Sequence, residues 1–86
     1  MMIIRVAARS LPAKVAGSIA GVVREEMRAE AQAIGAGAVF QAIKAVILAR
    51  SYLAEDGFDV ICLPAFTQVE IEGQEKTAIK FIVEPR

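Results

Sequence analysis

Apolar and polar residues change their period several times along the chain, and each change marks an expected secondary-structure element. The run Met2–Ala8, apolar except for Arg5, is typical of a strand that is covered on at least one face. A helix is expected to start at Ser10-Leu11-Pro12, because Ser10 is a capping residue type and Pro12 is tolerated only in a first turn. Its apolar residues recur at helical spacings and form one stripe: Val15, Ile19, Val22, Val23 and Met27.

Two glycines, Gly17 and Gly21, lie inside this first helix. Each costs about 1 kcal/mol relative to alanine, and a soluble helix accepts that cost mainly where another element must approach closely. We therefore expect a strand or a partner helix to pack against these two positions.

The middle of the chain predicts a second strand, Ala31–Ile34, a turn of small residues, Gly35–Ala38, and a second helix, Ala38–Leu53. This helix is apolar almost all round, through Val39, Phe40, Ile43, Val46, Ile47, Leu48 and Leu53. Helices of that kind are buried on two sides. One side is expected to cover the sheet and the other to meet a second copy of the chain, which predicts a homodimer or a tetramer.

The last third of the chain reads as a hairpin. Phe58–Glu72 is a long strand in which Pro64 predicts a bulge or a bend. Beyond Pro64, apolar and polar residues alternate along two strands. If the apolar residues of both strands share one face, Ile71 lies opposite Thr77 and Glu72 lies opposite Lys76. This register leaves Gly73-Gln74-Glu75 as the turn.

The expected element order is therefore β-α-β-α-β-β within a single domain, residues 1–86. Right-handed crossovers place both helices on the same side of the sheet. The predicted fold class is an α/β two-layer sandwich with a mixed four-stranded sheet and two helices on one face.

Composition supports an oligomer. Hydrophobic residues make up 56% of the chain before glycine is counted, whereas a typical domain reaches about 45–50% with glycine included. The longest apolar run, Ala36–Leu53, is interrupted by Lys44 and Arg50, and Met1–Ala8 lacks the features of a signal peptide. We expect a soluble cytoplasmic protein with no membrane partner, in which the single cysteine, Cys62, is a buried structural thiol.

Catalytic chemistry finds little support in these residues. The chain has no histidine, and neither Ser10 nor Ser51 has an identifiable base beside it. Glu70, Glu72 and Glu75 look like solvated positions rather than metal ligands. We expect no enzyme activity, metal, cofactor or small-molecule substrate.

Nucleic-acid binding is suggested by the distribution of charge and not by its sum, which is zero. The first 24 residues carry four basic residues and no acidic one. Arg9 and Lys14 flank the first strand–helix connection, while Gly35 and Gly37 would allow close backbone approach before the second helix. Lys44 is the fifth candidate contact, with Arg5, Lys76 and Lys80 as possible additions. Scattered bases of this kind also serve simply to solubilise a surface, and small residues before a helix also serve close packing.

Five segments resemble the stage V sporulation protein S family in order and spacing. They are VAGSIAGVVRE (15–25), AIGAGA (33–38), QAIKAV (41–46), ICLPAFT (61–67) and TAIKFIVEPR (77–86). That family is similar in architecture to the Alba domains, which share the element order, dimerise and bind DNA or RNA. The resemblance implies a role in sporulation control.

In Alba domains the basic loop before the first helix and the loop before the second helix face nucleic acid. These loops correspond to Arg9–Lys14 and Gly35–Ala38 here. The chain departs from the Alba pattern, since Ser10-Leu11 replaces a typical basic pair and the hairpin tip is acidic. Two hypotheses follow: a homo-oligomeric regulator that binds DNA or RNA weakly, or a protein–protein interaction module that binds no nucleic acid.

Overall fold

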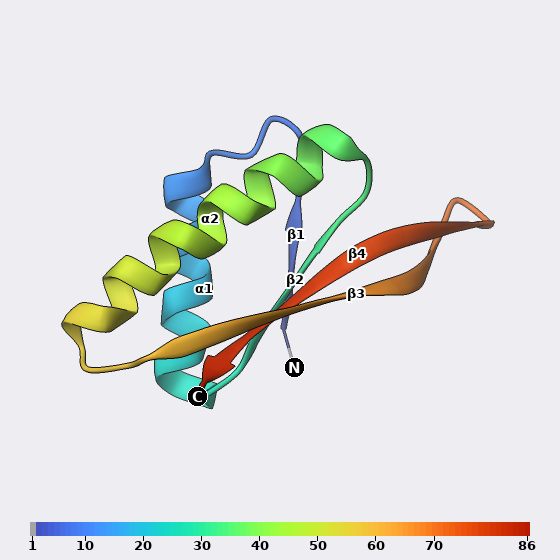
Figure 1. The fold of residues 1–86 in the computed structure, drawn as a ribbon. Helices are drawn as coiled ribbons and strands as arrows, with labels where there is room; N and C mark the ends of the chain where they lie inside the picture. Colours follow the sequence, from blue (N-terminus) through green and yellow to red (C-terminus); the bar gives the residue numbers. More distant parts are fainter. Residues whose placement is uncertain (1) are drawn as a thin grey trace.

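The computed structural model describes residues 2–86 and contains four strands and two helices (Figure 1). Their bounds are β1 Ile3–Val6, α1 Pro12–Glu26, β2 Ala29–Ala33, α2 Ala36–Glu55, β3 Val60–Ile71 and β4 Gln74–Pro85. The sheet order is β1-β2-β4-β3, in which β1 and β2 are parallel and the other pairs are antiparallel. This architecture confirms the predicted order and the mixed sheet.

Both helices pack into one hydrophobic core on one face of the sheet. The strand residues in that core alternate along the chain, as Ala29, Ala31 and Ala33 do on β2. The opposite face carries Ile3 and Arg5 of β1 with Glu30 and Gln32 of β2, and no helix covers it. The domain therefore has a covered sheet face and an open sheet face.

Alanine makes up most of the face that α2 presents to the core. Ala38, Ala42, Ala45 and Ala49 are between 0% and 3% exposed and lie three or four residues apart. Val46 and Leu53 are buried with them, whereas Phe40, Ile43 and Ile47 lie outside the core at 60%, 43% and 57% exposure. The expectation of a helix apolar on both sides is therefore met in a specific way: mainly alanines face inward, and three bulky apolar residues face outward.

The starts of both helices differ from the sequence-based expectation. Ser10 does not cap α1, because the N-cap residue is Leu11 and it makes no side-chain capping bond. The Ser10 hydroxyl instead accepts a hydrogen bond from the backbone N–H of Ala7 at 2.8 Å. Such local bonds compete with capping for serine side chains. The second helix starts two residues early, at Ala36, with Gly35 as its N-cap at φ 90°.

The hairpin register was predicted wrongly. Ile71 lies opposite Gln74, not Thr77, and Lys76 lies opposite Val69, not Glu72. The turn consists of Glu72 and Gly73 alone, and both have positive φ values, 52° and 79°. Two-residue turns of this kind match the twist of paired strands, so turn geometry overrode the pairing of opposite charges. Val69 and Ile71 consequently share the open sheet face with Lys76.

Pro64 causes no bulge. The pairing of β3 with β4 is continuous from Val60 to Ile71, and Pro64 lies opposite Phe81. β3 is an edge strand, so a residue without an N–H group can occupy a position that faces away from the sheet. The missing donor therefore leaves the β3–β4 ladder intact and interrupts only the free edge.

Gly17 and Gly21 do not accommodate a neighbour within this chain. A Cβ atom added at either position would meet nothing within 4 Å, so no strand or helix of the same chain packs there, and packing by a partner helix stays a prediction. Within one copy of the chain, the two glycines therefore weaken α1 with no compensating contact.

We predict that Gly17→Ala stabilises the domain by about 1 kcal/mol, since alanine gains helix propensity without a clash. This corresponds to a rise of roughly 4–8 °C in Tm for a domain of this size. The matched control is Ala13→Gly on the exposed side of the same helix, which should lower Tm by a similar amount. Thermal unfolding followed by circular dichroism measures both, and a lower Tm for Gly17→Ala would contradict the prediction.

Candidate nucleic-acid interface

The turn between β1 and α1 packs directly against the first turn of α2. A Cβ atom added at Gly37 would lie 3.1 Å from the Cβ of Ala8, so the backbones meet at the closest distance that side chains allow. One turn further along, the Gln41 side-chain N–H donates to the carbonyl oxygen of Ala8 at 3.1 Å. The two loops that sequence reasoning chose separately thus form one continuous surface.

This contact also explains Gly37. A Cβ atom there would lie closer to Ala8 than nearly all real Cβ contacts, so a larger residue would have to displace the loop by a few tenths of an ångström. Gly35 is needed for a different reason, because its φ of 90° is a conformation that side chains rarely adopt. Both glycines therefore have structural roles, and close approach by a ligand is a further possibility that their small size leaves open.

Arg9 directly follows Ala8 and Lys14 lies in the first turn of α1; both are exposed and form no ion pair among residues 2–86. Other arginines do pair with carboxylates: Arg24 with Asp56, Arg28 with Glu84, and Arg86 with Asp59. The exposed Leu11 lies between the two unpaired cations in sequence, at 60% exposure. The turn therefore presents positive charge that the described part of the chain does not neutralise.

The first turn of α2 adds its own positive potential. It contains no acidic residue, and no side chain caps its free N–H groups. Unpaired N–H groups at a helix start favour anions. Together with Arg9, this helix end makes a surface on which phosphate oxygens could be bound.

Lys44 does not belong to that surface. It lies seven residues along α2 from Gly37, which places it about 10 Å further along the helix axis. Its ammonium group sits over the ring of Phe40, 4.3 Å from the centroid. This cation–π contact directs Lys44 toward the exposed apolar side of α2, so the structure separates it from the other candidate contacts.

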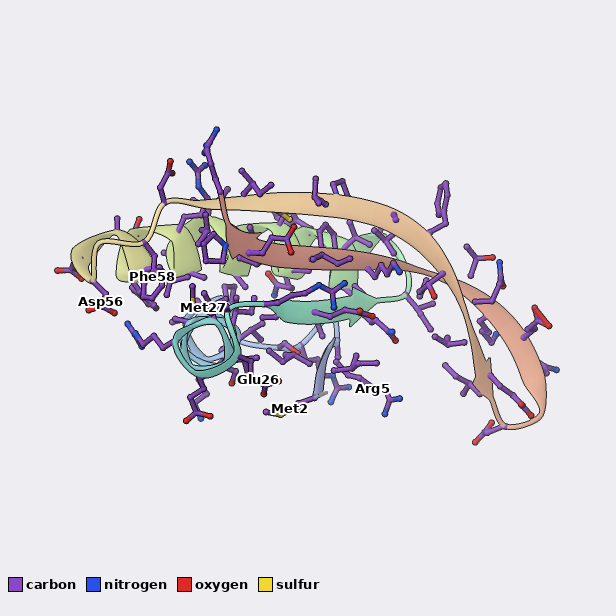
Figure 2. All side chains as sticks on the ribbon, turned by 90° about the horizontal axis from the view of Figure 1, so that it is seen from below. Met2, Arg5, Glu26, Met27, Asp56 and Phe58 are labelled. Carbon is purple, nitrogen blue, oxygen red and sulfur yellow. The ribbon has the colours of Figure 1, made fainter. Side chains whose placement is uncertain are left out.

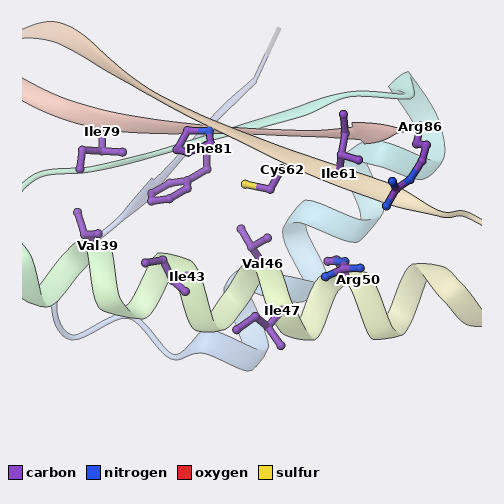
Figure 3. Close-up of a pocket in the computed structure, with 11 residues that line it drawn as sticks. Val39, Ile43, Val46, Ile47, Arg50, Ile61, Cys62, Ile79, Phe81 and Arg86 are labelled. Atoms are coloured by element: carbon purple, nitrogen blue, oxygen red, sulfur yellow. The ribbon is translucent and has the colours of Figure 1, made fainter.

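A second surface, missed as a cavity by sequence reasoning, runs between α2 and β3 (Figure 3). This apolar groove has a volume of about 610 Å³ and is lined mainly by Val39, Ile43, Val46, Ile47, Ile61, Cys62, Pro64, Ile79 and Phe81, with Arg50 and Arg86. Cys62 is half-buried in its wall, and burial raises the pKa of the thiol. The bulky residues of α2 indicated an apolar surface. Which β3 residues face them across the groove depends on the hairpin register.

The remaining chemistry of the described residues is sparse. No group of three or more histidine, cysteine, aspartate or glutamate side chains within residues 2–86 could hold a metal ion. The helix α2 is long and apolar enough, by length and composition, to cross a membrane. In this fold, however, its alanine stripe lies in the core.

Comparison with protein families gives one match that covers nearly the whole chain. The model of stage V sporulation protein S matches residues 2–86, which include both loops of the interface and the α2–β3 groove. The five segments noted in the sequence all lie within that match. The chain belongs to the stage V sporulation protein S family, a family of small sporulation-related regulators.

Proposed function

We propose that this protein is a homo-oligomeric, cytoplasmic regulator that binds nucleic acid, DNA or RNA, through the turn before α1 and the start of α2. The observation that carries the proposal is the packing of Ala8 on Gly37. Because the unpaired Arg9 directly follows Ala8 in the chain, this contact holds its backbone near the uncapped first turn of α2. A cation next to free helix N–H groups is a combination that holds phosphate oxygens.

Binding on this surface is expected to be weak and sensitive to salt. The chain carries no net charge, so the long-range attraction of a strongly basic protein is absent. With two cations per chain and two chains, about four phosphates would be contacted, and affinity would fall roughly 100-fold between 50 and 200 mM salt. The acidic hairpin tip, Glu70 to Glu75, argues against a further phosphate contact there.

We predict that Arg9→Glu combined with Lys14→Glu abolishes binding to DNA and RNA, in duplex or single-stranded form, while the fold is retained. Fluorescence anisotropy across a salt series measures the binding, and circular dichroism checks the fold. The matched control reverses Lys76 and Lys80 on β4, which changes the net charge equally. Neither lysine forms an ion pair among residues 2–86.

Equal binding by the two double variants would contradict the assigned surface, because bulk charge alone would then explain the effect. Absence of binding by the unmodified protein at low salt would overturn nucleic-acid binding as such. The leading account would then be recruitment of a protein partner, which the neutral charge and the acidic hairpin tip favour. A salt-resistant protein partner that survives nuclease treatment would support that alternative.

The oligomer is proposed to form through the apolar groove between α2 and β3. Phe40, Ile43 and Ile47 are the large apolar side chains that α2 exposes, and Ile43 and Ile47 line this groove. A second copy is the occupant that the patch fits, because a twofold axis sets one apolar surface against the same surface. A standard interface needs about 800 Å² per partner, a modest share of the chain's 5264 Å².

We predict that Ile47→Glu converts the oligomer to a monomer, since a charge in the middle of the apolar contact would be buried without a partner. Ser51→Glu, one turn further along the exposed side of α2, is the matched control and should leave the oligomer intact. Size-exclusion chromatography with light scattering gives the mass of each variant. A monomeric unmodified protein, or an unchanged oligomer with Ile47→Glu, would contradict this assignment.

A further inference from the structure

The outer part of the β3–β4 hairpin, residues 66–79, projects beyond both helices and is called the hairpin arm below (Figure 1). In Figure 2 the arm curves toward the side of the sheet on which Arg5 is labelled. Val69 and Ile71 on its inner side line a groove beneath the hairpin arm, about 490 Å³ in volume, together with Arg5 and Ala8. Its outer border is the free edge of β3, which pairs with no strand other than β4.

The hairpin turn determines which backbone groups of β3 face this free edge. Ile71 lies directly opposite Gln74 across the two-residue turn, so these two residues exchange both of their backbone hydrogen bonds. Every second residue of β3 therefore points its N–H and C=O groups toward β4, and the residues between them point theirs outward. Because the pairing is continuous back to Val60, the even-numbered residues of β3 face the free edge.

Pro64 fits this assignment and limits the part of the edge that is open to pairing. It is one of the even-numbered residues, and it has no N–H group to offer. Beyond it, Phe66, Gln68 and Glu70 are exposed, and their outward N–H groups donate to no other group among residues 2–86. A row of such groups is a template for one more strand. The proline therefore protects the edge beside α2, whereas the edge of the arm stays open.

Apolar side chains accompany the open edge on both faces of the arm. Phe66 is 77% exposed, more than any other large apolar residue among residues 2–86, and it lines a shallow hollow with Pro64 and Ile79. Val69 and Ile71 lie on the opposite face, and Ile71 is 42% exposed. Side chains of an added strand would lie directly beside these residues. The arm therefore offers backbone groups and apolar surface to the same occupant.

Acidic side chains indicate the charge of that occupant. Glu70 lies directly opposite Glu75 on the same face of the hairpin, and like charges at opposing positions are destabilising. Glu72 in the turn adds a third carboxylate, and none of the three forms an ion pair among residues 2–86. A cation beside Glu70 would relieve the repulsion. The strand β3 contains no basic residue, so pairing with the β3 strand of a second copy would not supply one.

We propose that the free edge of the arm binds an extended, basic peptide segment of a partner protein, which adds to the sheet beside β3. Its backbone pairs with the outward groups of Phe66, Gln68 and Glu70, as in other cases of strand addition. Its basic side chains lie beside Glu70 and the ring of Phe66, and its alternate apolar side chains lie beside Val69 and Ile71. This surface includes no residue of the two loops, so the inference goes beyond nucleic-acid binding and does not depend on it.

The probe is a seven-residue peptide of alternating lysine and valine, blocked at both ends, and the measurement is hydrogen exchange of single backbone N–H groups by NMR. In the free protein, the N–H groups of Phe66, Gln68 and Glu70 should exchange rapidly, and those of Thr67 and Val69 slowly. Saturation with the peptide should slow the first set about tenfold or more. Protection of the first set without peptide would mean that a second copy occupies the edge, which would overturn the proposal.

A pair of variants at one position tests the backbone contact. Gln68→Pro removes an outward N–H group and leaves the pairing with β4 intact, as Pro64 already does, so it should weaken peptide binding about tenfold. Gln68→Ala keeps the N–H group and is the matched control, because both variants lose the side-chain hydrogen bonds to Thr77. Circular dichroism checks the fold. Equal peptide affinity of the two folded variants would contradict strand addition.

Modified peptides test the same contact without changing the protein. Methyl groups on the backbone nitrogens of either the lysines or the valines block one edge of the peptide and leave the other edge free. One of the two methylated peptides should therefore lose binding and the other should keep it, and the one that fails reports whether the added strand is parallel or antiparallel to β3. If both bind as well as the unmodified peptide, the edge is not the site.

Charge variants test the basic character of the partner. Glu70→Gln should weaken the lysine peptide roughly two- to fivefold at low salt. Glu55→Gln at the end of α2 removes the same charge far from the arm and is the matched control. A peptide with glutamate in place of lysine should not bind. Equal binding of the lysine and glutamate peptides, or equal effects of the two variants, would show that the partner is not selected by charge and would overturn the assignment of a basic segment.

Discussion

The contact between Ala8 and Gly37 determines how the functional surfaces of this domain are arranged. It holds the turn after β1 against the start of α2 and so fixes the position of Arg9 relative to the uncapped helix end. Ala8 also lines the groove beneath the hairpin arm. The contact between the Ala8 methyl group and Gly37 is short-range and depends on packing alone. The loop surface and the groove beneath the hairpin arm nevertheless both include Ala8.

The alanine stripes of the core make this closeness possible. Four alanines on α2 and three on β2 are almost completely buried, so small side chains make up much of the contact between this helix and the middle of the sheet. The same arrangement pushes Phe40, Ile43 and Ile47 outward. The arrangement of alanines and bulky apolar residues along α2 therefore produces both the close packing inside the chain and the exposed apolar surface. This is why the sequence of α2 is apolar on all sides.

Periodicity was sufficient to predict the order of elements, the mixed sheet and the two helices, because alternating and helical patterns are local. It was not sufficient for the hairpin, where Glu72 and Gly73 adopt positive φ values and shift the register by three residues. That shift brings Val69 and Ile71 to the groove with Arg5, so a groove that joins β1 to the hairpin could not be found without the register. Ser10 and Gly17 show the same limit, since their residue types fit roles that the local backbone does not give them.

The candidate loops were found from sequence because basic residues and glycines stand next to predicted helix starts. Their joining into one surface was not predictable, since Ala8 and Gln41 are 33 residues apart. Lys44 was grouped with them by charge alone, and the structure moves it to the side of Phe40. Charge identifies candidate contacts, whereas packing decides which of them can act together.

The central claim is that the two loops bind nucleic acid as one surface held by the Ala8–Gly37 contact. The most direct measurement compares nucleic-acid affinity, by anisotropy at low salt, for Gly37→Val and Gly17→Val. Both replace a helical glycine and change no charge, but only the first presses on another element. The account predicts that Gly37→Val weakens binding while Gly17→Val does not. Equal affinities for the two folded variants would contradict it.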